Sequence, residues 1–311
     1  MTLTTLSPTS HNITWEFDTL GQAGNFLSDI WGIDENNVWA VGYIDLPSGS
    51  SGIIKWDGIN WQPFIASSGV KYGIYGFNET SIFVVGESAN RGFVGIWNGI
   101  NWTEYNYNYF YAKGDTIYPL NEIWGSSPED VWAGGKNGTL IHWNGTDWEK
   151  VQTEITGDIT ALYGISHDEI YLAAASVNYS ALYFYNGTNW NLESELPGIY
   201  AITLWKKPSG KLYVGGTGFF EYGDGIFNPI YIPGRTRGVI EIFGSDQNNI
   251  FTAGDFGEIT HFDGRTWTDI SLFEVPDGTY RVLRSVWCTE NKVFLAGVDQ
   301  NRAIIIQGTL N

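Results

Sequence analysis

The chain has 311 residues, of which 43% are apolar and 16% aromatic, so it can bury a large core. Its 34 acidic residues outnumber 16 basic ones, and the formal charge of −18 repels phosphate backbones and anionic lipid surfaces. We therefore expect no nucleic-acid partner and, because no stretch approaches 18 apolar residues, no insertion into a membrane. The single cysteine, Cys288, allows no disulfide within the chain, so the fold does not depend on oxidation.

The N-terminal segment is polar and rich in Thr and Ser. Residues 1–10 are predicted to be a flexible lead-in, and nothing before Asn12 combines the basic and apolar regions of a signal peptide. Few lysines together with many Trp, Asn, Thr and Gly residues favour a secreted or cell-surface protein whose export signal is absent from this chain. Residues 12–19 are predicted to form a β-strand around Trp15.

From residue 30 onward one unit of sequence recurs seven times. In its first copy Ile30-Trp31-Gly32 ends a predicted strand, and Val-Trp-Ala-Val-Gly at residues 38–42 forms the next one. The first strand of each unit ends at an aromatic residue: Trp31, Tyr75, Trp124, Tyr163, Trp205, Phe243 and Trp287. Because these aromatic residues recur with the framework of every unit, we expect them to fill the core rather than to bind a ligand.

The first six units also contain Asn-Gly or Asp-Gly between two strand-like runs, and these dipeptides supply the positive φ angles of a two-residue hairpin turn. The glycines of the six turns are Gly58, Gly99, Gly145, Gly187, Gly225 and Gly264. Consecutive glycines lie between 38 residues (Gly187 to Gly225) and 46 residues (Gly99 to Gly145) apart. This period fits a four-stranded propeller blade and is too long for leucine-rich or ankyrin repeats.

The two ends of the chain decide between an open array and a closed ring. After a last predicted strand at residues 303–307 the chain reaches Asn311 without room for a fourth strand, whereas residues 12–19 form a strand with no unit of its own. An N-terminal strand that completes the last blade removes two exposed sheet edges at once. We therefore predict one all-β domain over residues 1–311, a seven-bladed β-propeller closed by residues 12–19.

The motifs Ile-Trp-Gly, Val-Trp-Ala-Val-Gly and Trp-Asp-Gly-x-x-Trp, the last from Trp56 to Trp61, resemble the repeats of bacterial surface and secreted β-propellers. This resemblance covers about residues 12 to 308 and implies the fold. The Trp-rich, Gly-rich blades are also similar to those of tectonin and tachylectin lectins. The turn at Asp263 and Gly264 resembles the Asp-box of sialidase-type propellers, but it lacks the residue that separates Asp from Gly in that motif.

A long connection between the second and third units, residues 106–119, departs from the repeat and is a candidate binding surface. It contributes the aromatic residues Tyr107, Tyr109, Phe110, Tyr111 and Tyr118. Amphipathic aromatic side chains suit both protein and glycan sites, although local packing is the alternative interpretation. Loops of the same face are predicted to carry Asp45, Arg91, Tyr179, Phe219, Phe220, Phe256 and Arg302.

The central channel is the second candidate. Two residues before the strand-ending aromatic residues stand Asp29, Glu122 and Glu241, which would make the channel acidic. Three carboxylates around one axis attract a cation or ordered water, and solvated acids in a wet channel are the alternative. We predict no cofactor and no metal site.

No catalytic constellation emerges from the sequence. The histidines His11, His142, His167 and His261 lie in different units or in framework positions, and adjacent acids such as Asp34 and Glu35 recur in separate turns. We therefore predict a monomeric, non-catalytic binding or scaffold module for protein interaction on a secreted or surface protein, with a protein or glycan as the ligand. The alternative is a carbohydrate-binding, lectin-type propeller, and a weaker one is a glycan-cleaving, sialidase-like enzyme.

Overall fold

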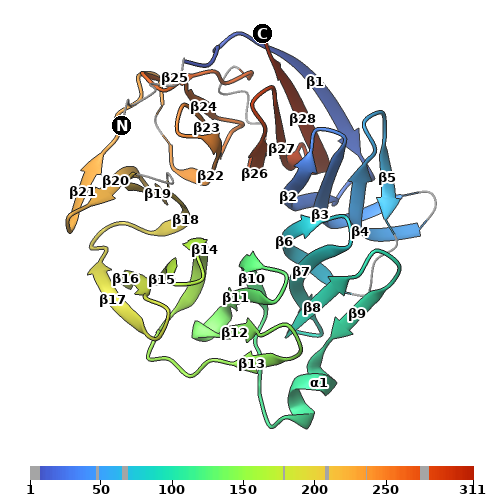
Figure 1. Ribbon diagram of the computed structural model, residues 1–311. Coiled ribbons are helices and arrows are strands. Elements are labelled where there is room, and N and C mark those ends of the chain that lie inside the picture. Colours follow the sequence, from blue (N-terminus) through green and yellow to red (C-terminus); the bar gives the residue numbers. More distant parts are fainter. Residues whose placement is uncertain are drawn as a thin grey trace, which may run out of the picture.

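Seven four-stranded antiparallel sheets surround a common axis in the computed structural model (Figure 1). The structure describes residues 8–46, 49–64, 69–177, 179–206, 210–235, 237–273 and 280–311, without the side chains of residues 46, 49–51 and 179. The strands of each blade are named a to d from the axis outward. The chain is a seven-bladed β-propeller, as the repeat predicts.

The blades follow one another along the chain. Blade 1 comprises β2 (Phe26–Asp34), β3 (Asn37–Leu46), β4 (Gly49–Trp56) and β5 (Trp61–Phe64). Blade 2 comprises β6 (Val70–Asn78), β7 (Ser81–Ser88), β8 (Arg91–Trp97) and β9 (Trp102–Tyr105). Blade 3 comprises β10 (Leu120–Ser127), β11 (Asp130–Gly135), β12 (Leu140–Trp143) and β13 (Trp148–Lys150), with a 3-10 turn, η1 (Lys136–Gly138). Blade 4 comprises β14 (Asp158–Ser166), β15 (Glu169–Ser176), β16 (Tyr179–Tyr185) and β17 (Trp190–Glu195).

The remaining blades repeat this order up to the closure. Blade 5 comprises β18 (Ala201–Lys206), β19 (Leu212–Gly216), β20 (Phe219–Gly223) and β21 (Ile226–Pro229). Blade 6 comprises β22 (Val239–Asp246), β23 (Asn249–Gly254), β24 (Ile259–Phe262) and β25 (Trp267–Asp269). Blade 7 comprises β26 (Arg281–Cys288), β27 (Lys292–Asp299), β28 (Arg302–Leu310) and, from the other end of the chain, β1 (Ile13–Leu20). A short helix, α1 (Tyr107–Ala112), lies in the connection from blade 2 to blade 3.

The N-terminal strand closes the ring. Strand β1 pairs antiparallel with β28 in a continuous register from Ile13 opposite Leu310 to Leu20 opposite Ala303. The segment before it is not free where the structure describes it, since Thr9 N donates to Asp263 O (3.1 Å) in blade 6. The predicted flexible lead-in therefore does not extend to Thr9, and residues 1–7 lie outside the described residues.

A β-bulge recurs in strand a of every blade. The pairing of strands a and b shifts register by one residue at the same point of all seven sheets. The extra residues are Ser28, Tyr72, Asn121, Thr160, Ile202, Ile240 and Arg284, and all seven line one cavity on the axis. Bulges re-aim side chains, so this device directs two successive residues of each strand a toward the axis.

The aromatic-Gly step packs neighbouring blades together. A Cβ built on Gly32 would lie 2.7 Å from the Trp287 ring of the preceding blade, and one on Gly164 would lie 2.4 Å from Cη2 of Trp124. The rings of Trp31 and Trp205 meet the glycines of blades 2 and 6 in the same way. At these four positions glycine is therefore required because the preceding blade's ring occupies the space of a side chain.

Gly164→Ala tests this packing. We expect it to destabilise the protein by about 1–3 kcal/mol, because the new methyl group forces the buried Trp124 ring out of its rotamer. Urea denaturation measures the effect. Gly218→Ala is the control, because the new Cβ would contact only the Phe220 side chain, so the loss of stability should be smaller. Gly114→Ala would not serve, because Gly114 has a φ of +81° that alanine adopts only under strain. Equal effects of the two substitutions would contradict this account.

Candidate functional site

The two faces of the ring carry different side chains. Connections between strands b and c and between successive blades emerge on one face, here called the top face, and the remaining turns emerge on the bottom face. Six of the seven arginines belong to top-face segments: Arg91, Arg235, Arg237, Arg281, Arg284 and Arg302. The bottom turns between strands a and b hold acids such as Asp34, Glu129 and Asp168. Although the chain is acidic, its guanidinium groups are concentrated on the top face.

One arginine of the top face is surrounded by tyrosines. The guanidinium carbon of Arg91 lies 5.7 Å from the ring centroid of Tyr107 and 5.9 Å from that of Tyr118. Tyr107 in turn stacks on Tyr111 at 5.3 Å between centroids. All three tyrosine side chains are exposed: Tyr107 by 41%, Tyr111 by 66% and Tyr118 by 38%. We call these four residues the Arg91–tyrosine cluster.

Arg91 has no carboxylate or hydrogen-bond partner for its side chain within the part of the chain that the structure describes. By contrast, Arg281 pairs with Asp299 at 2.9 Å and Arg235 with Glu258 at 3.3 Å. A guanidinium group presents five N–H donors in a fixed fork that matches carboxylate geometry. Arg91 therefore offers unused donors beside exposed aromatic rings.

The insertion that carries the tyrosines is anchored to blade 3. Asn106 caps helix α1 by accepting a hydrogen bond from Asn108 N (3.0 Å), and Lys113 pairs with Asp147 at 2.7 Å. The Tyr109 hydroxyl hydrogen-bonds the Asp147 carboxylate and accepts a bond from Trp148 N (3.2 Å). The cluster is thereby held on a fixed base.

Two of the predicted ligand-binding aromatic residues belong to that base. The side chain of Phe110 is 1% exposed and packs in a core cluster, so the prediction that it binds a ligand is wrong. Tyr109 packs against the same cluster and its hydroxyl is already bonded. The insertion thus combines both interpretations offered by the sequence, because Tyr109 and Phe110 pack locally while Tyr107 and Tyr111 face outward.

The other predicted loop residues do not join the Arg91–tyrosine cluster. Phe220 packs edge-on against Phe227 of its own blade, at 6.4 Å between centroids. Arg302 donates to Gly21 O (2.9 Å) beside the closing strand. The side chain of Tyr179 lies outside the described residues. These positions share the top face but not one site.

Two top-face arginines that were not among the predicted ligand-binding residues also lie beside aromatic rings. The guanidinium carbon of Arg237 lies 3.6 Å from the ring centroid of Phe256, and that of Arg284 lies 5.0 Å from the ring of Phe26. Neither has a carboxylate partner among the described residues. Their positions gave the available signal, because Arg237 lies two residues before strand a of blade 6 and Arg284 is the bulge residue in strand a of blade 7.

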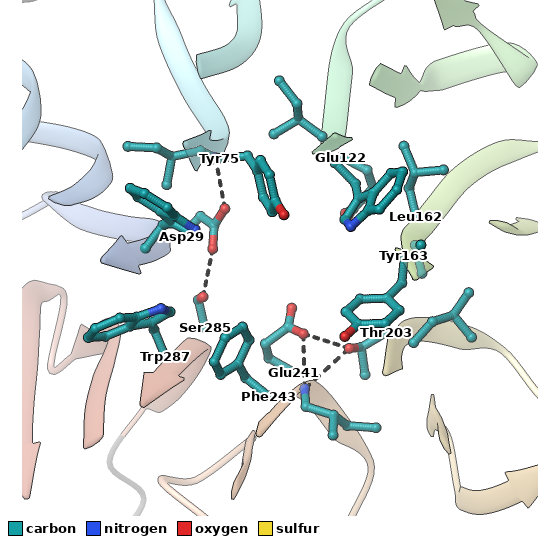
Figure 2. Close-up of a pocket in the computed structure, with 18 of the residues that line it drawn as sticks. Asp29, Tyr75, Glu122, Leu162, Tyr163, Thr203, Glu241, Phe243, Ser285 and Trp287 are labelled. Atoms are coloured by element: carbon teal, nitrogen blue, oxygen red, sulfur yellow. Dashed lines mark hydrogen bonds between the residues drawn. The ribbon is translucent and has the colours of Figure 1, made fainter. Parts of the chain in front are cut away.

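The axial channel brings the three predicted acids together. Asp29, Glu122 and Glu241 line the same cavity of about 390 Å³, and each comes from strand a of a different blade (Figure 2). The same three residues also line the 450 Å³ cavity at the top mouth, where the seven bulge residues lie. The predicted acidic channel is present in the structure.

Two of the three channel acids have hydrogen-bond donors, and one has none. Asp29 accepts from Ser285 Oγ (2.6 Å) and from the backbone N of Ile74 (2.8 Å), which belong to the two flanking blades. Glu241 accepts from Thr203 Oγ1 (2.7 Å) (Figure 2). Glu122 has no hydrogen-bond or ion-pair partner among the residues that the structure describes.

Burial raises the pKa of all three channel acids. It raises the pKa of Asp29 to about 6, against the effect of the Ser285 hydrogen bond, and that of Glu241 to about 8. The pKa of Glu122 is raised well above its usual value, first by burial and then by the charges of Glu241 and Asp29. At neutral pH the channel therefore binds protons and carries fewer than three negative charges.

Three of the four histidines, His11, His142 and His261, make framework contacts, whereas the His167 side chain is 76% exposed. His142 Nε2 lies 2.6 Å from Asp130 Oδ1, and its ring stacks on Trp132. His261 is fully buried against Phe251, and its Nδ1 lies 3.0 Å from that of His11. Across the described ranges, no three His, Cys, Asp or Glu side chains group as metal ligands would.

None of the helices in the described residues is long and apolar enough to cross a membrane.

No protein-family model and no curated protein matches the chain. Solved structures do resemble it. A structure of YCF48 bound to D1 peptide is 15% identical with a TM-score of 0.70, covering 98% of both chains. YCF48 from Cyanidioschyzon merolae is 13% identical with a TM-score of 0.64, covering 94% of this chain and 98% of that one. The WD40 β-propeller domain of Doa1 is 12% identical with a TM-score of 0.69, covering 96% and 98%. At these identities the likeness shows the fold alone.

Proposed function

We propose that this propeller is a non-catalytic scaffold module that binds an acidic segment of a protein partner on its top face, with the Arg91–tyrosine cluster as the anchor. The observation that carries the proposal is the guanidinium group of Arg91, which lies between exposed tyrosines and has no carboxylate partner in the described part of the chain. A protein with twice as many acids as bases has many carboxylates available to pair its arginines, yet Arg91 pairs with no carboxylate of the described residues. A partner carboxylate completes the site.

The chemistry of the cluster supports an acidic peptide. Tyrosine and arginine are the residue types that dominate binding energy at protein interfaces. The stacked Tyr107 and Tyr111 rings add apolar area beside the charge. A solved structure of the same fold, that of YCF48, contains a bound peptide. A secreted or surface location is part of the proposal and is supported by composition alone.

Arg91→Ala tests the proposal. Fluorescence anisotropy with acidic, neutral and basic peptide libraries should show that the protein binds the acidic peptides. Arg91→Ala should lower the affinity for these peptides about tenfold or more, the usual effect of losing a charge-assisted hydrogen bond. Arg91→Lys should weaken binding less. Arg265→Ala is the matched control, because Arg265 is exposed in a bottom-face hairpin. Preference for basic peptides, or equal loss in the Arg265 variant, would overturn the proposal.

A further inference from the structure

A pair of aromatic rings flanks the hairpin between strands c and d in most blades. The pairs are Trp56–Trp61, Trp97–Trp102, Trp143–Trp148, Tyr185–Trp190, Tyr222–Phe227 and Phe262–Trp267, with centroids between 4.5 and 5.7 Å apart. Each pair lies toward the outer rim, where neighbouring blades diverge. An additional side chain is needed there to fill the wedge.

In two blades an aromatic ring from the end of the preceding blade's strand d fills this position. Phe64 of blade 1 packs edge-on against Trp97, at 5.0 Å, and Trp102, at 6.3 Å. Tyr105 of blade 2 packs against Trp143 of blade 3 at 5.7 Å. Phe64 and Tyr105 are each the third residue after the Trp that opens strand d. The geometry of the molecule itself therefore shows which group fits the wedge.

The wedge between blades 3 and 4 lacks such a ring. The residue third after Trp148 is Val151, and strand β13 ends before it, at Lys150. Trp132 covers the inner part of the pair, at 5.0 Å from Tyr185 and 5.5 Å from Trp190. Outside Trp132 a groove of about 650 Å³ remains, which we call the blade 3–4 groove.

We infer that the blade 3–4 groove binds an aromatic side chain of a protein partner, in the position that Phe64 and Tyr105 occupy in the neighbouring wedges. The inference rests on the proposed protein-binding function. An incoming ring packs edge-on against the Tyr185–Trp190 pair, an arrangement that aromatic groups favour. Leu192, which lines the groove and is 54% exposed, extends the apolar wall.

The rim of the groove suits the backbone that carries such a side chain. Gln152, Glu154, Thr188 and Asn189 line it, and their side chains make no hydrogen bond to any residue in the described ranges. Amide and hydroxyl groups at these positions can bond the N–H and C=O groups of an extended peptide. The insertion with the Arg91–tyrosine cluster is fastened to this same blade, since Lys150 Nζ donates to Thr116 O (3.2 Å). Blade 3 therefore holds the insertion that carries the tyrosines of the Arg91–tyrosine cluster and also forms one wall of the blade 3–4 groove.

A substitution that fills the blade 3–4 groove with a side chain of the protein itself tests the inference. Val151→Phe places in blade 3 the ring that blades 1 and 2 already supply. We expect N-acetyl-L-tryptophanamide to bind the unaltered protein with a Kd of about millimolar, shifting the indole N–H signals of Trp132 and Trp190 in NMR spectra. Val151→Phe should weaken this binding about tenfold or more and should raise the melting temperature. Val151→Ala, which keeps the groove open, should retain the binding.

Matched controls identify what occupies the groove. Ile270→Phe adds a ring at the corresponding position after Trp267 and should leave the affinity unchanged. N-acetyl-L-alaninamide should not bind. The inference is overturned if N-acetyl-L-tryptophanamide causes no shifts, if Val151→Phe leaves its affinity unchanged, or if neutral trisaccharides bind in its place. Each of these results leaves the Arg91 experiment intact, and failure of the Arg91 experiment with retained tryptophanamide binding would overturn the acidic-peptide proposal alone.

Discussion

Deletion of residues 1–20 is expected to lower the free energy of unfolding by several kcal/mol, a large share of the about 5 to 15 kcal/mol that stabilises a typical protein. The deletion removes β1 and leaves β28 as a sheet edge along the register from Ala303 to Leu310. That edge contains the consecutive apolar residues Ile304, Ile305 and Ile306. An exposed apolar edge pairs readily with other chains, so we expect both a lower urea midpoint and concentration-dependent association in gel filtration.

A peptide supplied in trans separates loss of β1 from nonspecific damage. Residues 8–20 as a synthetic peptide should raise the urea midpoint of the truncated protein and suppress its association, because the peptide restores the pairing with β28 and the contacts of Thr9 and His11 with blade 6. The same peptide with Phe17→Pro should fail, since proline removes a backbone donor and Phe17 is half exposed, so little packing is lost. A truncated protein with an unchanged midpoint would show that ring closure contributes little.

The architecture is predictable from the sequence because its signals are local and repeated. Asn-Gly and Asp-Gly turns fix the hairpins, and the surplus strand at residues 12–19 balances the missing strand after residue 307. The channel acids are also predictable, since the same register position lines the axial cavity in six of the seven blades. The bulges are not, because a one-residue register shift leaves no mark in a strand with apolar residues on both faces, such as Phe26–Asp34.

The candidate binding surfaces are less predictable because they depend on contacts between blades. Alternating Asn and Tyr at residues 106–111 favours a strand, yet Asn106 caps a helix there and burial of Phe110 in the core stabilises it. No local pattern shows that Arg91 has no carboxylate partner among the described residues, or that Val151 stands where blades 1 and 2 have an aromatic ring. Both facts arise from which side chains the neighbouring blades bring close.

Glu122→Gln is expected to stabilise the protein at pH 8 and to leave its stability at pH 4 nearly unchanged. At pH 4, below the ordinary value of 4.5, the carboxyl is protonated in the folded chain and mostly protonated in the unfolded chain, and the protonated group resembles an amide. At pH 8 the unfolded chain carries a solvated carboxylate, whereas in the folded channel burial and the charges of Glu241 and Asp29 oppose ionisation. We expect a gain on the order of 1 to 3 kcal/mol, the usual penalty for a poorly compensated polar or charged group in a protein interior.

The sign follows from proton binding. The folded pKa of each channel acid lies above its unfolded value, so the folded protein binds more protons and its stability falls as pH rises through that window. The window runs from 3.8 to about 6 for Asp29 and from 4.5 to about 8 for Glu241. Buried His261, whose pKa is lowered to about 3, has the opposite effect below its ordinary value of 6.5. The difference between the variant and the unaltered protein isolates the Glu122 contribution from this background.

Asp29→Asn is the matched comparison, because Asp29 lies in the same channel but accepts hydrogen bonds from Ser285 and Ile74. The asparagine side chain has a single oxygen and cannot replace both carboxylate oxygens that accept these hydrogen bonds. The gain in the free energy of unfolding at pH 8 should therefore be smaller than for Glu122→Gln, or become a loss. Thermal unfolding of the three proteins at half-unit steps from pH 4 to 8 measures both effects. Curves that stay parallel across this range would show that Glu122 is ionised without penalty, as a fully solvated channel acid would be, and the channel would then have no proton-linked effect on stability through this residue.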